Sequence, residues 1–483
     1  MLESQLLKHC QGFINGQWVD ADSGKTLTVY NPVDGAALAQ VPGMGPEETT
    51  RAIEAARATL RNPASLDKRR EWLNNIVNAL AANREEIGRI LCLEHGKPWK
   101  EAQGEVDYAA GFFRYCADNL EALAPRELEE KPRNCSWTVH YRPAGVVALV
   151  TPWNFPIGMI AKKLSAAIAA DCPSVIKPSS KTPLTMVALF TLLDEALDMP
   201  AGKVNLVTGS AGPIGDTLCD HPDVRVLSFT GSTEVGRELI ERSAPQVKKL
   251  TLELGGNAPY IVFGDADLDA AADNLIGNKF RGGGQTCVCA NRIMVHESVA
   301  TDFAERLKTR AAKLKVGDGM EADTDIGPLI DRNGHEKVRR HLTDALDKGA
   351  ELVMGDVPPS LENDWGGFFP PAIVLGVTPQ MACWREETFG PLVPIATFSD
   401  DDQAIDMANQ TEFGLASYIF TGDDQRAQKV IAGLEFAHVG YNTGSGPTPE
   451  APFGGMKQSG YGREGGLEGL FEFVEPQTVP RGA

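Results

Sequence analysis

The middle of the chain alternates short apolar runs with longer amphipathic segments, and this alternation constrains the fold more than any other feature. Apolar runs of strand length cover residues 146–150, 174–177, 204–207 and 226–229, and each is followed by a segment of helical pattern. Strands that alternate with helices form parallel βαβ units, which assemble into a doubly wound sheet. A second series of this kind runs from about residue 253 to 440. The sequence therefore predicts an α/β fold with parallel sheets.

The flanking regions have other patterns. Residues 12–41 alternate apolar and polar side chains between turn signals, which predicts short strands and hairpins. The segment 46–123 has helical periodicity, and Pro125 would end it because proline cannot continue a helix interior. Residues 126–143 indicate an extended polar arm, and residues 471–474 indicate a strand in the tail.

Composition argues against several classes of function. The chain has 483 residues, enough for two or three domains, with a formal net charge of -19 and a pI near 4.9. That charge argues against nucleic acid or an anionic membrane surface as the main partner. No secretory signal and no membrane-spanning run is visible, and the cysteines form no CxxC pair. Reduced thiols in the cytoplasm fit this pattern better than a disulfide framework.

Two short motifs match known patterns without the context those patterns need. Residues 460–465 match GxGxxG, but too little chain follows them for a dinucleotide-binding βαβ unit. Asp265, Asp267 and Asp269 resemble the start of a calcium loop, but Ala270 stands where that loop needs glycine. An acidic cluster at a helix N-terminus is the better interpretation, and we expect no metal site.

Four segments carry residues that can do chemistry, and the first is Gly284-Gln-Thr-Cys287. A cysteine among small residues can sit on an open loop with its sulfur facing a cleft, where it can act as a nucleophile. The alternative is a buried structural cysteine, which is the usual fate of a free thiol.

The second and third segments offer an amide and a carboxylate. Asn154 directly follows a buried strand, in a loop made rigid by two prolines, and is a candidate hydrogen-bond donor to an oxyanion. It could instead cap the next helix. Glu253, followed by Leu-Gly-Gly, could approach a substrate and activate water as a general base. The alternative for Glu253 is a surface residue at a strand end.

The fourth segment spans residues 229–236, between a strand and a helix, and includes Gly231 and Ser232. It offers backbone N–H groups and a helix N-terminus to a phosphate. The alternative is an ordinary turn between a strand and a helix.

These four segments occur in order with three others, Lys-Pro-Ser-Ser at 177–180, Glu-Glu-Thr-Phe-Gly-Pro at 386–391 and Pro-Phe-Gly-Gly at 452–455. Together they resemble the aldehyde dehydrogenase superfamily over nearly the whole chain. Within that superfamily, residues 280–292 and 457–465 are most similar to succinate-semialdehyde dehydrogenases.

The resemblance implies a mechanism residue by residue. Cys287 would attack the aldehyde carbon, Asn154 and the backbone N–H of Cys287 would hold the oxyanion, and hydride would pass to the nicotinamide. Glu253 would activate the water that hydrolyses the thioester, and Lys163 and Glu464 match positions suggested to relay protons. The cofactor contacts implied are Glu387 and Phe389 at the nicotinamide ribose, Lys177 and Ser180 at the adenosine ribose, Gly231 and Ser232 at a phosphate, and Trp153 in the wall of the cleft.

The cofactor would be NAD or NADP, and the sequence favours NADP. In the position three residues after Lys177, a glutamate would accept from the ribose 2′-OH and repel a 2′-phosphate. This chain has Ser180 there, which removes that repulsion. We therefore expect NADP to be accepted and preferred, with NAD use left open.

The substrate would be a small aldehyde, and the resemblance favours succinate semialdehyde or a similar acidic semialdehyde. Arg281 would pair with the substrate carboxylate, which suits a guanidinium fork, although a surface salt bridge is its alternative. Lys162 stands where these relatives usually carry a second arginine, and the loop that begins at Ser445 differs from theirs. Phe155 and Phe453 would form aromatic walls. A different aliphatic or aromatic aldehyde therefore stays an alternative.

Two other functions stand against hydrolytic oxidation. An acylating enzyme would pass the thioester to coenzyme A, but its relatives generally lack a glutamate at the position of Glu253. A non-catalytic structural homologue would not need Cys287, Asn154, Glu253 and Glu387 together. We therefore expect an NAD(P)-dependent aldehyde dehydrogenase.

The resemblance also implies domains and an assembly. An exposed strand edge is a liability unless it is paired, so we expect a homodimer or homotetramer. Cys289 could form a reversible disulfide with Cys287, as in some relatives. The parts implied are a Rossmann-type cofactor domain at 1–123 and 144–252, an α/β catalytic domain at 253–440, and a β oligomerisation arm and tail at 124–143 and 455–483.

Overall fold

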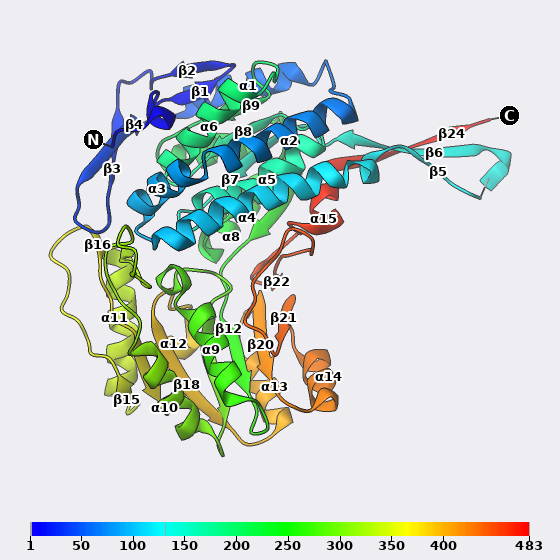
Figure 1. Ribbon diagram of the computed structural model, residues 1–483. Coiled ribbons are helices and arrows are strands. Elements are labelled where there is room, and N and C mark those ends of the chain that lie inside the picture. The colour runs from blue at the N-terminus through cyan, green and yellow to red at the C-terminus, as the bar shows by residue number, and fades with distance from the viewer. Residues whose placement is uncertain (1, 131, 483) are drawn as a thin grey trace.

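Two α/β bodies and a projecting β arm make up the computed structural model, which describes residues 2–130 and 132–482 (Figure 1). The first body contains most of the chain up to β11 and the second contains most of the rest, so the two α/β series of the sequence correspond to two sheets. Among the described residues, no helix combines the length and apolar character needed to cross a membrane.

The first body is built on an eight-stranded sheet in the order β2-β1-β9-β8-β7-β10-β11-β23. The run β9-β8-β7-β10-β11 is parallel, which confirms the predicted βαβ units. Its strands are β1 Gly12–Ile14, β2 Gln17–Val19, β7 Val146–Val150, β8 Ser174–Lys177, β9 Val204–Leu206, β10 Val224–Thr230, β11 Lys249–Glu253 and β23 Gly460–Tyr461. Its helices are α1 Pro46–Thr59, α2 Leu66–Ala82, α3 Arg84–His95, α4 Trp99–Asp118, α5 Pro156–Ala169, α6 Leu184–Ala196, α7 Ala211–Asp220 and α8 Thr233–Ser243.

The unbroken apolar run of β7 follows from its place at the centre of this sheet. Val147 and Leu149 join the core formed with α2 to α6, whereas Val146 and Ala148 join the core formed with α1 and α7. Successive side chains of a strand point to opposite faces, and both faces of this sheet are covered by helices. Every residue of the strand is therefore apolar.

The second body is built on a seven-stranded sheet in the order β15-β17-β18-β13-β12-β20-β21, parallel except for β15 at one edge. Its strands are β12 Ala258–Val262, β13 Ala290–His296, β15 Glu351–Met354, β17 Ala372–Leu375, β18 Leu392–Phe398, β20 Ala416–Phe420 and β21 His438–Tyr441. Its helices are α9 Leu268–Lys279, α10 Ala300–Ala311, α11 Arg332–Asp347, α12 Ala382–Arg385, α13 Asp401–Asn409 and α14 Asp424–Gly433.

Three short two-stranded ladders complete the sheets. They pair β3 Thr26–Tyr30 with β4 Ala37–Pro42, β14 Leu329–Asp331 with β16 Trp365–Gly367, and β19 Phe413–Gly414 with β22 Met456–Lys457.

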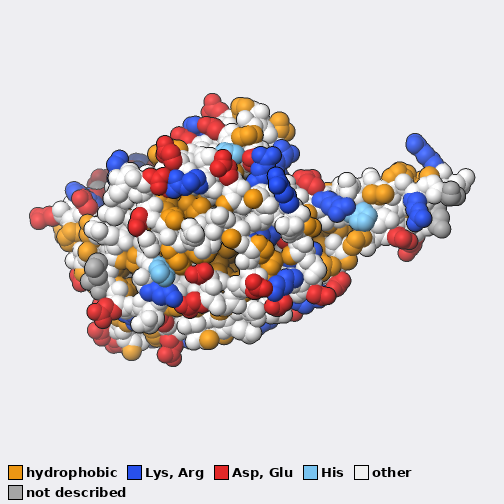
Figure 2. All heavy atoms as spheres, turned by 90° about the horizontal axis from the view of Figure 1, so that it is seen from above, with side chains coloured by type: hydrophobic (Ala, Val, Ile, Leu, Met, Phe, Trp, Pro, Cys, Tyr) orange, Lys and Arg blue, Asp and Glu red, His pale blue; other side chains and the backbone are white. Residues whose placement is uncertain are grey.

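The arm is a three-stranded antiparallel sheet that projects from the body (Figures 1 and 2). It consists of β5 Arg126–Glu127, β6 Ser136–Pro143 and β24 Val474–Arg481, and β24 pairs with β6 along its whole length. The arm therefore joins the end of the chain to a segment more than 300 residues earlier in the sequence.

The tail differs from the sequence prediction. A strand over residues 471–474 is wrong, because α15 Gly466–Phe471 occupies the first of these positions and β24 begins only at Val474. Four residues are too few for periodicity to separate a strand from a helix end, and Leu470 and Phe473 are buried against the first body. We expected residues 455–483 to belong with the arm, but β23 pairs with β11 in the first sheet.

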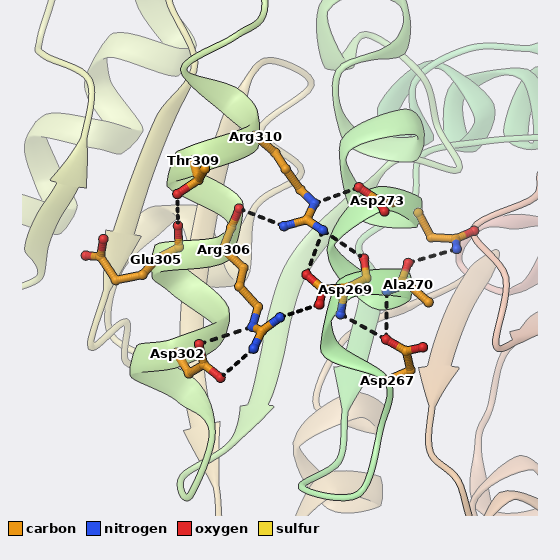
Figure 3. A network of polar contacts seen from close by, with 10 residues as sticks. Asp267, Asp269, Ala270, Asp273, Asp302, Glu305, Arg306, Thr309 and Arg310 are labelled. Carbon is orange, nitrogen blue, oxygen red and sulfur yellow. Dashed lines mark hydrogen bonds and ion pairs between the residues drawn. The ribbon is translucent and has the colours of Figure 1, made fainter.

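The acidic cluster at residues 265–269 lies at the N-terminus of α9, as the sequence predicts, and Asp267 caps that helix (Figure 3). The carboxylate of Asp267 accepts hydrogen bonds from the backbone N–H groups of Asp269 and Ala270 at the start of α9. Asp269 pairs in turn with Arg306 and Arg310 of α10. In the part of the chain that the structure describes, no group of histidine, cysteine and acidic side chains could hold a metal ion.

Candidate active site

The carboxyl ends of three neighbouring parallel strands bring the predicted segments together. Asn154 follows β7, Gly231 follows β10, and Glu253 ends β11. In open α/β sheets, ligands bind in the crevice outside these ends. The site therefore lies at one edge of the first sheet, where the second body faces it with the loop that carries Cys287.

Cys287 lies between two hollows of the protein surface and lines both. One is a cleft of about 650 Å³ that also contains Trp153, Gly231 and Glu387. The other is a cavity of about 330 Å³. The sulfur is therefore not sealed in the core, in contrast to the alternative of a buried structural cysteine.

The loop that carries Cys287 depends on glycine. Gly282, Gly283 and Gly284 all have left-handed backbone conformations, with φ of 58°, 66° and 77°. A Cβ atom on Gly284 would lie 2.5 Å from the carbonyl oxygen of Gly390, so only glycine fits there. The side chain of Gln285 bonds to the backbone of Gly282 and Ile330, which fixes the loop on both sides.

The thiol of Cys287 is protonated at rest. Burial raises its pKa to about 12, and the ammonium of Lys162 acts in the opposite direction. A nucleophilic thiolate therefore has to form with the help of neighbouring groups and of the substrate.

The amide of Asn154 is directed at the cysteine loop. Its Nδ2 donates a 3.0 Å hydrogen bond to the carbonyl of Gln285, and its Oδ1 has no hydrogen-bond partner among the described residues. The N-cap of α5 is Phe155, and its side chain makes no capping hydrogen bond. Capping by Asn154, the alternative function of this side chain, is thus not what the structure shows.

Glu253 is a buried carboxyl group at the end of β11, with only 5% of the residue exposed. This contradicts the alternative of a surface residue at a strand end. Its Oε2 has no partner within residues 2–130 and 132–482. Burial, and then the nearby Glu464, raise the pKa of Glu253 well above its usual value. A carboxylate with a raised pKa is a stronger base, which suits activation of water near neutral pH.

Lys163 and Glu464 form a buried pair behind Glu253. The Nζ of Lys163 donates hydrogen bonds of 2.5 Å to Glu464 and 3.0 Å to the hydroxyl of Ser228. The Nζ of Lys162 lies 3.7 Å from the second oxygen of Glu464. The carboxylate of Glu464 thus lies between the side chains of two buried lysines.

The cleft beside Cys287 has the features of a dinucleotide site. Ser232 caps α8 and lines the cleft. The N-terminus of that helix therefore faces the cleft and can bind a phosphate. Glu387 is held by the backbone N–H of Gly256, 3.1 Å from its Oε1, and burial raises its pKa to about 7. Phe389 follows in a left-handed conformation with φ of 58°. The predicted residues Trp153, Gly231, Ser232, Glu387 and Phe389 all line this cleft.

Two predicted cofactor residues lie outside the lining of the cleft. Lys177 is buried, its Nζ donates a 2.9 Å hydrogen bond to the carbonyl of Pro178, and burial lowers its pKa to about 8. Ser180 is exposed to solvent. The structure therefore does not bring either side chain to the wall of the cleft.

The smaller cavity contains most of the predicted substrate residues. Lys162, Arg281, Phe155 and Phe453 line it, and the guanidinium of Arg281 lies 5.5 Å from the centre of the Phe155 ring. Arg281 forms no ion pair among the described residues, in contrast to the alternative of a surface salt bridge. The cavity thus presents two cationic side chains between aromatic walls, together with the carboxyl groups of Glu101 and Glu105.

Ser445 is not part of this wall. Its carbonyl accepts a hydrogen bond from His438, and its hydroxyl bonds to Thr443, so the residue is turned toward its own loop. Gly446 and Pro447 line the cavity in its place.

Several lining residues were not predicted from the sequence. Tyr108 and Glu101 of α4 line the substrate cavity, and the hydroxyl of Tyr108 is buried without a partner in the described part of the chain. Lys181 and Lys337 line the cleft. Glu101, Glu105 and Tyr108 share one face of α4 through their helical spacing. This periodicity was the one signal in the sequence that could have indicated the lining residues of α4.

Cys289 is turned away from both hollows. It is buried, and its sulfur bonds to the carbonyls of Ala290 and Lys279 at 3.4 and 3.7 Å. Cys287 and Cys289 are both free thiols in the structure.

Comparison with known proteins agrees with this geometry. The profile of the Aldehyde dehydrogenase family matches residues 18–479. A succinate-semialdehyde dehydrogenase (NADP(+)) of Escherichia coli is 45% identical over 467 residues, which are 96% of each chain. A glutarate-semialdehyde dehydrogenase of Pseudomonas putida is 45% identical over 479 residues, which are 98% of each chain.

A solved structure extends the similarity to three dimensions. The crystal structure of an oxidoreductase from Marinobacter aquaeolei is 64% identical, with a TM-score of 0.97 and coverage of 100% of both chains. The chain therefore belongs to the aldehyde dehydrogenase family and is an NAD(P)-dependent enzyme that oxidises aldehydes.

Proposed function

We propose that this enzyme oxidises a small acidic semialdehyde, succinate semialdehyde or a close analogue, to the carboxylic acid through a thioester on Cys287. The observation that carries this proposal is that Cys287 lines both the wide cleft and a cavity that contains Lys162 and Arg281. A short semialdehyde has an aldehyde for the sulfur and a carboxylate for the two cations. The names of the relatives from Escherichia coli and Pseudomonas putida support an acidic substrate of this size.

The first half of the reaction uses Cys287 and Asn154. The sulfur attacks the aldehyde carbon, and the Asn154 amide together with the backbone N–H of Cys287 donates to the oxyanion that forms. A nicotinamide cofactor held by the residues of the cleft would supply the hydride acceptor, and the acyl group would then remain on Cys287 as a thioester. Lys162 stabilises the thiolate by its positive charge, because it lines the same cavity.

The second half of the reaction uses Glu253. Its ionised carboxylate takes a proton from water, and the resulting hydroxide attacks the thioester and releases the acid. Glu464, hydrogen-bonded to Lys163, lies in the interior beside Glu253 and raises its pKa. In this proposal the Lys163–Glu464 pair carries the proton onward.

The residues of the cleft would hold NADP. The N-terminus of α8 with Ser232 would bind a phosphate, Glu387 would bind a ribose, and Trp153 and Phe389 would enclose the nicotinamide end. Preference for NADP is supported by the absence of a carboxylate at position 180, and Lys177 would have to turn from Pro178 to reach a 2′-phosphate. A much lower kcat/KM with NADP than with NAD would overturn this preference.

The arm and its assembly belong to the same proposal. In the arm, β24 forms the outer strand of the sheet, and Val479 on it is 41% exposed. An uncovered edge of this length is a surface for pairing, so we propose a homodimer or homotetramer that buries the arm. The predicted division into cofactor domain, catalytic domain and arm, and the cytoplasm as the compartment, stay expectations.

A kinetic screen tests the proposed substrate. Succinate, glutarate and aspartate semialdehydes would be compared with butanal and benzaldehyde, each with NADP and with NAD, by the absorbance of the reduced cofactor. We expect kcat/KM for the best acidic semialdehyde to exceed that for the neutral aldehydes by about 100-fold or more, as one charge-assisted contact provides. A neutral aldehyde as the best substrate would contradict the proposal.

A further inference from the structure

A buried ion pair with no part in the chemical steps lies behind the loop of Asn154. Lys97, in the turn between α3 and α4, pairs with Glu105 of α4 at 2.5 Å, and both side chains are only 1% exposed. Neither charge is needed for attack on the aldehyde, for hydride transfer or for hydrolysis as proposed above.

The pair contacts the backbone on both sides of Phe155. The Nζ of Lys97 donates a 2.8 Å hydrogen bond to the carbonyl oxygen of Asn154 and lies 3.9 Å from the centre of the Phe155 ring. The Oε1 of Glu105 accepts from the N–H groups of Ile157 and Gly158, at 3.0 and 3.1 Å. The Lys97–Glu105 pair therefore joins the end of the loop to the first turn of α5.

The first turn of α5 needs such a partner. Its N-cap residue, Phe155, has no side chain that can accept a hydrogen bond, so the N–H groups at the start of the helix would otherwise be unpaired. Glu105 satisfies two of them, and a carboxylate is favoured at the positive end of a helix dipole. The charge of Glu105 is balanced by Lys97, whose second bond reaches Asn154.

Stability alone does not explain the pair. Removing two charges from water offsets most of their attraction, so a buried ion pair stabilises a fold little compared with apolar side chains. The side chain of Asn154, in contrast, is held by one hydrogen bond to Gln285. An amide anchored so lightly keeps its direction only if its backbone is fixed from behind.

We propose that Lys97 and Glu105 are positioning residues, which fix the backbone of Asn154 so that its amide meets the oxyanion of the attacked aldehyde. This proposal rests on the proposed role of Asn154 as an oxyanion donor. In this proposal both residues act through Asn154. Lys97 lines neither hollow, whereas Glu105 also borders the substrate cavity, so Lys97 carries the test.

A double-mutant cycle tests the proposal. The rate of hydride transfer in the first turnover would be measured by stopped flow for Lys97→Met, Asn154→Ala and the double variant, and the dissociation constant of NADPH would be measured by fluorescence. We expect Lys97→Met to slow hydride transfer about 10- to 100-fold, because a displaced catalytic group loses about that much. The dissociation constant of NADPH should stay within about twofold of the parent value. In the double variant the rate should equal that of Asn154→Ala, because no amide is left to position.

Matched controls separate positioning from general damage. Lys203 forms another buried pair, with Asp171 at 2.5 Å and side chains 3% and 4% exposed, away from both hollows. Lys203→Met should lower the melting temperature without slowing hydride transfer. Lys97→Arg, which keeps a donor and a charge, should recover part of the rate. If Lys97→Met does not fold, Glu105→Gln takes its place in the cycle, since the glutamine oxygen still accepts from Ile157 and Gly158. Glu105 also lines the substrate cavity, so the rate of this variant is compared at saturating aldehyde.

The outcomes distinguish this proposal from the proposed function. Parental hydride transfer in Lys97→Met, beside slow transfer in Asn154→Ala, would overturn the positioning role alone. Losses that multiply in the double variant would overturn it too, because Lys97 would then act independently of Asn154. Parental transfer in Asn154→Ala would overturn the oxyanion role, and the positioning role with it.

Discussion

Lys163 and Glu464 meet in the interior of the protein, where the lysine donates a 2.5 Å hydrogen bond to the carboxylate. Less than a tenth of either residue is exposed. After burial, the negative charge of Glu464 has the largest effect in raising the pKa of Glu253. The pair therefore tunes the base that the proposed hydrolysis needs, which makes the second half of the reaction open to direct tests.

Replacement of Glu253 should separate the two halves of the reaction. In Glu253→Gln the attack and the hydride transfer remain, so a stopped-flow trace should still show a burst of reduced cofactor close to one per active site. The steady rate after the burst should fall by about 100- to 10,000-fold, the usual contribution of a general base. Loss of the burst itself would mean that Glu253 acts before the thioester forms.

The pH dependence of the steady rate should follow the ionisation of Glu253. Its pKa is raised, so the carboxyl is protonated and inactive at low pH, and the rate should increase as pH rises through that pKa. In Glu464→Gln the like charge is lost while Lys162 and Lys163 remain, and both lower the pKa of Glu253. The midpoint of the pH–rate profile should therefore move to lower pH, and an unchanged or higher midpoint would contradict this account.

The two cations of the small cavity should decide the preference for acidic substrates. Arg281→Met and Lys162→Met should each raise KM for succinate semialdehyde about 10- to 100-fold, because each removes a hydrogen bond to a charged group. KM for butanal, which has no carboxylate, serves as the control and should change little in Arg281→Met. Because Lys162 also stabilises the thiolate, Lys162→Met is judged by the ratio of KM for the two aldehydes. Equal effects on both aldehydes would show that these side chains shape the cavity without recognising the carboxylate.

The conformation of the loop at residues 386–389, part of which lines the cofactor cleft, should depend on His341, which does not itself line the cleft. The ring of His341 bonds to Thr388 at 3.0 Å and to Glu386 at 3.1 Å, and Glu387, Thr388 and Phe389 line the cofactor cleft. His341→Ala should raise KM for the cofactor about 3- to 30-fold, as lost hydrogen bonds loosen the loop.

The pH dependence of the same loop gives an independent check. Burial lowers the pKa of His341 to about 4, so the ring is neutral from pH 5 to 8. The pH dependence of KM for the cofactor should therefore be the same in the parent enzyme and in His341→Ala over this range. A step between pH 5 and 8 seen only in the parent enzyme would mean that the histidine becomes charged in the folded protein.

The main elements and the reacting groups could be predicted from the sequence because their signals are local. Apolar strands followed by helices give the two parallel sheets, and Cys287, Asn154 and Glu253 each stand in a short segment with its own chemical logic. The strand predicted at 471–474 failed because four residues do not determine a period, and Gly466 to Phe471 form a helix instead.

Residues that depend on tertiary contacts could not be predicted in this way. The spacing of Glu105 and Tyr108 indicates a common face of a helix, but not that this face borders a cavity. The side chain of Lys177 folds back onto Pro178, and Ser445 turns toward its own loop, because rotamers and loop directions are set by neighbours distant in sequence. The pairing of Lys97 with Asn154 is of the same kind.

The covalent step at Cys287 is the central claim, and mass spectrometry tests it most directly. The Glu253→Gln protein would be mixed with succinate semialdehyde and NADP, quenched in acid, digested and compared with a Cys287→Ser control. The account predicts one succinyl group on the peptide that contains Cys287, assigned to that residue by fragmentation, and none in the control. An unmodified Cys287 after a full burst of NADPH, or the acyl group on Cys289, would contradict it.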